Sequence, residues 1–164
     1  ETEPRPYGIK AAKDGTLWIA YNGTNKIGAM HPGTMAVKYF EIPNERSRVR
    51  RLDLDSQGRV WFVNSTLGKI GRLDPSTGAI KQWDSPSGAS SHPYALAVID
   101  DVIWYNESGM RPDALVRFNP ESESFQSWAI PSGVGIVRNV WKTEAGNLLI
   151  HQSSSNQIGL VKIN

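Results

Sequence analysis

The chain has 164 residues, 39% hydrophobic and 21% charged, which is the balance of an ordinary globular domain with a sizeable core. The formal net charge is only +2, and lysine and arginine are scattered among aspartate and glutamate. Neither a nucleic-acid surface nor a membrane contact is therefore expected, because there is no basic block and no apolar run of membrane-spanning length. The absence of cysteine excludes disulfides, thiolate nucleophiles and zinc ribbons.

A repeat organises the chain. The stretch DGTLWIAYNGTNKIGAMHP at residues 14–32 returns as SQGRVWFVNSTLGKIGRLDP at residues 56–75. The same position is marked in successive copies by Trp18, Trp61, Trp104 and Leu149. This period predicts four repeat units within a single domain. Their approximate bounds are residues 5–43, 47–86, 91–131 and 135–164.

Each unit has the pattern of short strands separated by turns. In the first unit, strands are predicted over residues 7–12, 17–21, 26–30 and 37–42. Asp-Gly and Pro-Gly-Thr between them supply the backbone conformations that tight turns need. Four strands in roughly 40 to 45 residues is the size of one β-propeller blade. The fold class predicted is all-β, a propeller of four-stranded blades, with a β-sandwich as the alternative.

The repeated tryptophans are expected to pack one blade against the next, with carbohydrate stacking as the alternative role. In the fourth unit only three strands are predicted, and residues 1–6 are too short and proline-rich to serve well as a fourth. The expectation is that the chain is the C-terminal portion of a larger ring, or that a second chain supplies the edge.

Three segments carry a family resemblance: PYGI…DGTLWIAYNGTNKIGAMHP, RRLDLDSQGRVWFVNSTLGKIGRLDPSTGAIKQW and PYALAV…IWYNE…LVRFNP. They resemble the streptogramin B lyase (virginiamycin B lyase) propellers of bacteria. The resemblance implies a seven-bladed ring, so that about three further blades would complete it. It also implies a magnesium-dependent carbon–oxygen lyase that opens a cyclic depsipeptide by elimination at its ester, with a histidine base and two glutamates on the metal.

This sequence departs from that catalytic pattern. The family's Glu-Pro-His corresponds to His92-Pro93-Tyr94 in the third unit, and its Trp-Phe-Thr-Glu corresponds to Trp104-Tyr105-Asn106-Glu107. Glu107 is then the one candidate ligand for Mg²⁺, while His92 and Tyr94 are weak catalytic candidates. A neutral tyrosine, with an ordinary pKa near 10, is a poor base at neutral pH.

Two sets of repeat-equivalent polar residues are the candidate ligand site. The strand-start residues open the first strand of each unit: Tyr7, Arg50, Tyr94 and Arg138. The strand-end residues close the second strand: Tyr21, Asn64, Glu107 and Gln152. Both sets are predicted at the mouth of the central channel, with contributions from Arg5, Arg48, Arg51 and His92. Alternating aromatic and guanidinium groups favour a small polar or anionic ligand. The alternative is a structural plug, in which Arg50 and Arg138 pair with Glu107.

The function predicted first is a non-catalytic or divergent ligand-binding propeller, periplasmic or secreted in a bacterium. Residues 85–91 are expected to form a flexible loop that covers the ligand. The alternative is a metal-dependent lyase or lactonase acting on a cyclic ester, which would need Glu107 and further ligands. A third reading is a platform for protein interactions, since the fold alone does not choose among these.

Overall fold

The structure is a computed structural model that describes residues 3–132 and 136–163. Its strands are β1 (Pro6–Ala11), β2 (Leu17–Tyr21), β3 (Lys26–Met30), β4 (Val37–Glu41), β5 (Val49–Leu54), β6 (Val60–Asn64), β7 (Lys69–Leu73), β8 (Ile80–Asp84), β9 (Pro93–Ile99), β10 (Val102–Glu107), β11 (Ala114–Asn119), β12 (Ser124–Ala129), β13 (Val137–Lys142), β14 (Leu148–Gln152) and β15 (Gln157–Val161). One short 3₁₀ helix, η1 (Gly88–Ser91), precedes β9. None of the described residues forms a helix long and apolar enough to cross a membrane.

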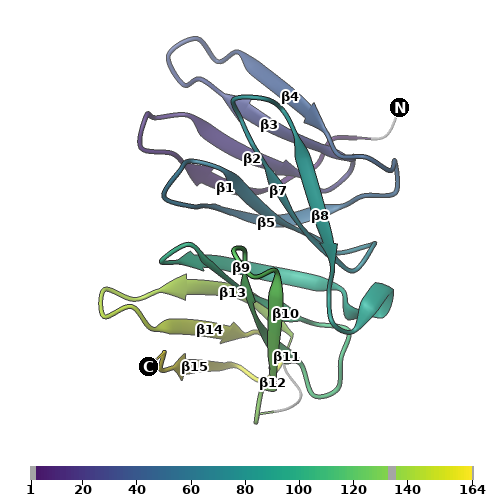
Figure 1. The fold of residues 1–164 in the computed structure, drawn as a ribbon, viewed down its shortest axis with the longest axis vertical. Helices are drawn as coiled ribbons and strands as arrows, with labels where there is room; N and C mark the ends of the chain where they lie inside the picture. Colours follow the sequence, from purple (N-terminus) through teal and green to yellow (C-terminus); the bar gives the residue numbers. More distant parts are fainter. Residues whose placement is uncertain (1–2, 133–135, 164) are drawn as a thin grey trace.

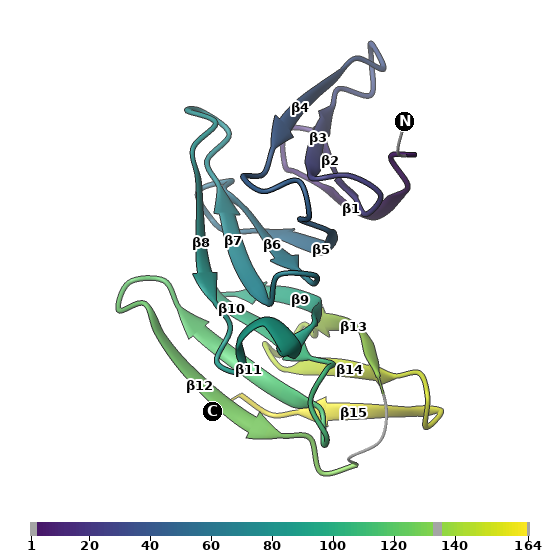
Figure 2. The same cartoon turned by 90° about the vertical axis from the view of Figure 1, so that its right-hand side faces the viewer.

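The strands form four antiparallel sheets, and within each sheet neighbours in the chain are neighbours in space. The sheets are β1–β4, β5–β8, β9–β12 and, with three strands among the described residues, β13–β15. They stand side by side in an arc, with β1, β5, β9 and β13 along its concave side (Figures 1 and 2). The prediction of an all-β propeller is confirmed. The size of the complete ring stays a prediction.

The turns form where the sequence supplies glycine after a polar residue. Gly15 and Gly58, at φ +87° and +76°, take the left-handed conformation in the tight turns after β1 and β5. An aspartate braces each turn: Asp14 accepts a hydrogen bond from the backbone N–H of Thr16, and Asp55 accepts one from that of Gln57. The first strand of each blade therefore reverses directly into the second.

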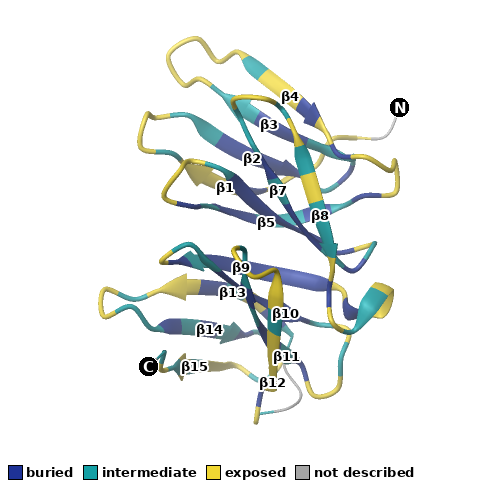
Figure 3. Ribbon diagram, viewed as in Figure 1, coloured by how far each residue is buried: buried dark blue, intermediate teal, exposed yellow. Residues whose placement is uncertain are grey.

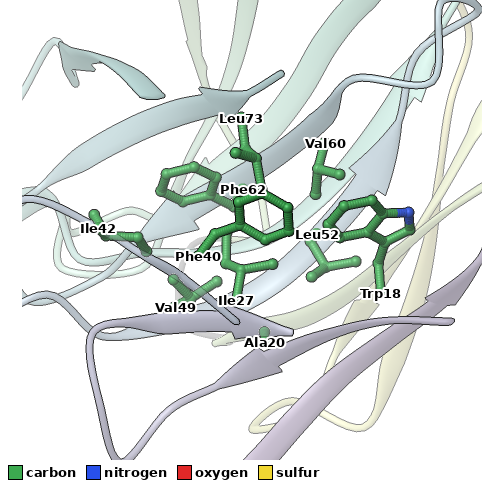
Figure 4. Close-up of a cluster of buried hydrophobic side chains, with 10 residues drawn as sticks. All are labelled: Trp18, Ala20, Ile27, Phe40, Ile42, Val49, Leu52, Val60, Phe62 and Leu73. Atoms are coloured by element: carbon green, nitrogen blue, oxygen red, sulfur yellow. The ribbon is translucent and has the colours of Figure 1, made fainter. Parts of the chain in front are cut away.

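The core lies between blades rather than inside any single sheet. Between the first two blades it consists of Trp18, Ala20, Ile27, Phe40, Ile42, Val49, Leu52, Val60, Phe62 and Leu73 (Figure 4). The outer strands β4 and β12 are largely exposed, whereas β6 and β10 are buried (Figure 3). The repeated tryptophans Trp18, Trp61 and Trp104 are at most 6% exposed, which confirms their predicted packing role. A blade thus buries its face only against the next blade.

A β-bulge interrupts the first strand of every blade near its start. Pro6 pairs with Tyr21, but the next paired residue of β1 is Gly8, so Tyr7 has no partner across the ladder. The corresponding register shifts in the other blades leave Arg50, Tyr94 and Arg138 without one. A bulge turns an extra residue out of the ladder. All four strand-start residues therefore occupy the same backbone feature.

Candidate functional site

The strand-start residues converge, although they come from four different blades. The hydroxyls of Tyr7 and Tyr94 hydrogen-bond to each other, so blades one and three meet across blade two. Their rings are in an edge-to-face arrangement with centroids 6.2 Å apart. The first strands bring this about because β1, β5, β9 and β13 are packed in sequence along the concave side (Figure 2).

Three guanidinium groups surround the two tyrosines. The Cζ atom of Arg50 lies 4.6 Å from the ring centroid of Tyr94 and 5.9 Å from that of Tyr7. The Cζ atom of Arg138 lies 5.8 Å from the ring centroid of Tyr94, and that of Arg51 lies 5.0 Å from the ring centroid of Tyr7. These distances are within the range of cation–π attraction, which holds the guanidinium groups over the rings. We call these five residues the Tyr/Arg cluster.

The positive charge of the Tyr/Arg cluster is not neutralised by the described part of the chain. Within residues 3–132 and 136–163, the ion pairs shorter than 4.0 Å involve none of Arg50, Arg51 and Arg138. Arg50 Nε donates to Ser65 Oγ at 3.1 Å, and the buried Nε of Arg51 has no hydrogen-bond partner in this part of the chain. Three like charges held together without a carboxylate favour an anion between them.

Tyr94 contributes no negative charge of its own. Burial raises the pKa of its hydroxyl, and the hydrogen bond with Tyr7 raises it further, while Arg50 and Arg138 lower it by less. Tyr94 is 7% exposed, whereas Tyr7 is 38% exposed. Tyr94 therefore keeps its proton at physiological pH, so the charged groups of the cluster are the guanidinium groups, which are hydrogen-bond donors only.

The strand-end residues lie at the same end of the blades, each across the ladder from the residue just before a strand-start residue, but their side chains are buried. The ring of Tyr21 lies over Gly28, where a Cβ atom would come within 2.7 Å of it, and its centroid is 5.5 Å from that of Tyr39, with the two rings tilted by 55°. Asn64, Glu107 and Gln152 are at most 4% exposed. The two sets therefore share one end of the blades, but among the described residues no hydrogen bond or ring contact joins a strand-end side chain to the Tyr/Arg cluster. A ligand-binding role for the strand-end set stays a prediction.

Three strand-end residues hold the segment that arrives from the preceding blade. Asn64 Nδ2 donates to Ser47 Oγ at 3.0 Å, and Ser132 Oγ donates to Gln152 at 2.5 Å. Glu107 accepts hydrogen bonds from Ser85 Oγ, Ser87 N and Ser87 Oγ. We call Ser47, Ser85, Ser87 and Ser132 the connector serines. Their role as hydrogen-bond partners was not predicted from the sequence, although each lies within four residues of Pro43, Pro86 or Pro131, which recur with the repeat.

Glu107 does not fit the magnesium site that the family resemblance implies. Its carboxylate is 1% exposed and already accepts three hydrogen bonds from serines, at 2.5 to 3.0 Å. No group of three or more histidine, aspartate or glutamate residues that could hold a metal ion occurs among the described residues. A hard divalent cation takes six or more oxygen ligands, and a carboxylate occupied by donors is a poor one. The pairing of Glu107 with Arg50 and Arg138, expected for a plug, is likewise not found in the described structure.

The remaining candidates, His92, Arg48 and Arg5, make their contacts outside the Tyr/Arg cluster. His92 is exposed, in the left-handed conformation at φ 44°, and its Nδ1 lies 3.2 Å from the carbonyl oxygen of Ser65. Arg48 donates to the carbonyls of Glu45 and Ser47, both at 2.7 Å. Arg5 lies at the surface, 3.9 Å from Glu3.

The segment expected to be a flexible cover over the ligand is anchored in the structure. Its residues 85 and 87 are the serines bound to Glu107, and η1 follows directly. Ser85 and Ser91 are buried. The segment therefore belongs to the packed connection between blades two and three.

Four antiparallel sheets, each packed against the next, define the chain as a β-propeller, and a polar cluster lies where their first strands begin. The sequence profile of the virginiamycin B lyase family matches residues 1–164. The chain belongs to this family. None of the curated protein sequences compared with the chain matches it.

Solved structures show the same fold at low sequence identity. A streptogramin B lyase superimposes with a TM-score of 0.87 at 23% identity, covering 99% of this chain and 53% of the other. Virginiamycin B lyase from Staphylococcus aureus superimposes with a TM-score of 0.80 at 23% identity, and the match covers 98% of this chain and 56% of the lyase. The extracellular domain of a provisionally assigned one-component system from B. thetaiotaomicron superimposes with a TM-score of 0.71 at 19% identity, and the match covers 97% of this chain and 22% of that domain. The chain therefore spans little more than half the length of the lyases that it resembles.

Proposed function

We propose that this chain belongs to a ligand-binding propeller whose Tyr/Arg cluster holds a small molecule through an anionic group. The observation that carries the proposal is the convergence of Arg50, Arg51 and Arg138 on two tyrosines with no carboxylate partner among the described residues. An arginine fork binds carboxylate or phosphate oxygens in pairs, and whichever tyrosine accepts in the Tyr7–Tyr94 hydrogen bond adds one neutral hydroxyl donor.

The cluster is suited to binding rather than to magnesium-assisted elimination. Three positive charges repel a divalent cation at this position, and Glu107 is occupied by the connector serines. Because burial raises the pKa of Tyr94, its hydroxyl stays protonated at neutral pH and is less available as a general base than that of an ordinary tyrosine. These arguments support a binding role for the residues of this chain, ahead of the lyase or lactonase alternative.

The test is calorimetric titration of the 1–164 chain with matched anionic and neutral probes. Gluconate and sorbitol share a polyol chain and differ in the carboxylate, and inorganic phosphate tests a second anion class. Gluconate or phosphate is expected to bind, sorbitol is not, and affinity should fall with added salt. Arg50→Gln should weaken binding about tenfold or more, because a charge-assisted hydrogen bond contributes about 1.5 to 3 kcal/mol.

Arg117→Gln is the matched control, since it removes the same charge from strand β11 of blade three. Thermal unfolding of the variants separates the proposal from a structural plug. A ligand site with uncompensated charges predicts that Arg50→Gln and Arg138→Gln leave the stability unchanged or raise it, because like-charge repulsion is relieved. A clear loss of stability together with unaltered or absent anion binding would overturn the proposal.

We also propose that the protein acts outside the bacterial cytoplasm, a location supported by the similar fold of a domain described as extracellular. Fractionation of the native bacterium, followed with an antibody to the chain, tests this. Recovery with cytoplasmic markers would contradict it.

A further inference from the structure

The Tyr/Arg cluster carries more positive charge than one carboxylate can match. Arg50 lies over both tyrosine rings, and it shares the ring of Tyr94 with Arg138 and the ring of Tyr7 with Arg51. None of the three arginines has an ion-pair partner among the described residues. A ligand with one negative charge would leave two guanidinium groups unmatched, whereas a dianion leaves one. The cluster therefore favours a ligand whose binding group carries two negative charges.

The guanidinium groups also approach the cluster from different directions. Arg51 is held over the ring of Tyr7, in blade one, and Arg138 over the ring of Tyr94, in blade three. The planes of those two rings are inclined by 71°. A carboxylate has two oxygens in one plane, which match a single arginine fork, but a phosphoryl group presents three oxygens that point in different directions. The arrangement therefore favours a tetrahedral group over a planar one.

The hydrogen-bond donors of the cluster are largely unused by the described residues. Nε of Arg50 donates to Ser65 Oγ at 3.1 Å, which leaves the two terminal nitrogens of its guanidinium group for a ligand. The buried Nε of Arg51 has no partner in the described part of the chain, and an unpaired buried donor costs stability. The Tyr7–Tyr94 hydrogen bond uses one hydroxyl hydrogen and leaves the other free to donate. Several acceptor oxygens on one small group would satisfy these donors together.

On the basis of the anion site proposed above, we propose that the group bound there is a dianionic phosphoryl group, either free phosphate or the end of a phosphate monoester. At neutral pH such a group carries a charge of about −1.5 to −2 and has three acceptor oxygens. A phosphate diester has a single charge and one terminal oxygen fewer, so the cluster discriminates against it. The guanidinium groups of Arg50, Arg51 and Arg138 bind the oxygens, and the free tyrosine hydroxyl donates to one of them.

Three small anions separate charge from shape in calorimetric titrations of the 1–164 chain. The titrations are run at about pH 7.5, above the second pKa of a phosphate monoester, which is about 6. Methyl phosphate is a tetrahedral dianion, dimethyl phosphate is a tetrahedral monoanion, and malonate is a dianion built from two planar carboxylates. Methyl phosphate is expected to bind about tenfold or more tightly than either, because a charge-assisted hydrogen bond changes affinity by about this factor.

Inorganic phosphate, titrated in parallel, distinguishes the two sources of the phosphoryl group. Tighter binding of inorganic phosphate than of methyl phosphate indicates free phosphate as the ligand. Tighter binding of methyl phosphate indicates an ester, because its methyl group stands where the rest of the ligand would be attached.

The variants Arg51→Gln and Arg138→Gln test whether the phosphoryl group lies in the cluster. Each is expected to weaken methyl phosphate binding about tenfold or more and dimethyl phosphate binding less, because the lost charge then acts on one negative charge instead of two. Arg117→Gln in β11 is the control and should leave both affinities unchanged, since Arg117 lies outside the cluster and donates to Gln126. Phosphorus NMR of methyl phosphate with the unmodified chain gives a readout that needs no variant, and the resonance should shift or broaden saturably.

The outcomes separate this inference from the proposed function. If dimethyl phosphate or malonate binds as tightly as methyl phosphate, the phosphoryl group is wrong and the anion site stands. If none of these anions binds saturably, and gluconate does not either, both are wrong. Methyl phosphate binding that is unaltered in Arg51→Gln and in Arg138→Gln would place the ligand outside the cluster and would also overturn the inference.

Discussion

Replacing Glu107 separates a structural carboxylate from a metal ligand. The side chain is 1% exposed and accepts hydrogen bonds from Ser85 Oγ at 2.6 Å, from Ser87 N at 3.0 Å and from Ser87 Oγ at 2.5 Å. In Glu107→Ala the Ser85 hydroxyl keeps Tyr105 as a partner at 2.8 Å, but the two donors of Ser87 lose theirs. Ser87 is half-buried, so its two unpaired donors cost less than fully buried ones, but the deleted side chain also leaves a cavity, and a total loss of about 3 kcal/mol is expected.

Glu107→Gln should cost less, about 1 kcal/mol, because the amide keeps one acceptor oxygen for Ser85 Oγ and Ser87 N, and its NH2 group can donate to the Ser87 hydroxyl in place of accepting from it. Urea unfolding followed by tryptophan fluorescence measures both losses, and the alanine variant should melt about 6 to 12 °C lower. Glu121→Gln, at an exposed position, is the control and should stay within about 0.5 kcal/mol of the parent chain.

The reasoning fails if Glu107→Ala is as stable as the parent chain. It also fails if Mg²⁺ stabilises the parent chain and not Glu107→Gln, because that result would show a metal held by this carboxylate. The structure predicts that added Mg²⁺ has the same effect on both proteins.

Two further predictions concern contacts between segments of successive repeats. Gly109→Ala should destabilise the chain by about 2 kcal/mol or more in urea unfolding, since a Cβ there would lie 1.9 Å from the carbonyl oxygen of Ser90. Gly33→Ala is the control and should be nearly neutral, because its Cβ would meet only the exposed side chain of His31, at 3.2 Å. Hydrogen bonds from Ser56 lower the pKa of Asp101, so the stability it contributes is present above the ordinary value of 3.8 and lost as the pH falls through the lowered value. Asp101→Asn should therefore flatten the fall of the urea midpoint between about pH 5 and pH 3, and an unchanged slope would contradict this.

The sequence predicted the fold well because the repeat and the strands have the same physical cause. A blade can bury its face only against another blade, so apolar residues and turn glycines must recur with the period. The strands predicted in the first unit agree with β1 to β4 to within one residue at each end. The convergence of Tyr7, Arg50, Tyr94 and Arg138 followed from the same period, since equivalent positions in a propeller face a common axis.

The strand-end residues show where that reasoning stops. Asn64, Glu107 and Gln152 recur as faithfully as the strand-start residues, yet they are satisfied by connector serines inside the protein. Residue type alone does not distinguish a polar group that faces the channel from one that faces a loop. The path of each connector is set by its own turns and not by the repeat, so the donors for Glu107 were not predictable from spacing.

The bulge in each first strand has a consequence for how such a protein diversifies. Tyr7 and Arg138 have no partner across the ladder, so exchanging their side chains alters neither strand register nor the apolar contacts between blades. Blades one and four thus each offer a position that selection can change with little effect on folding. A family sharing this backbone can acquire new ligands through a handful of substitutions, while the scaffold around them stays constant.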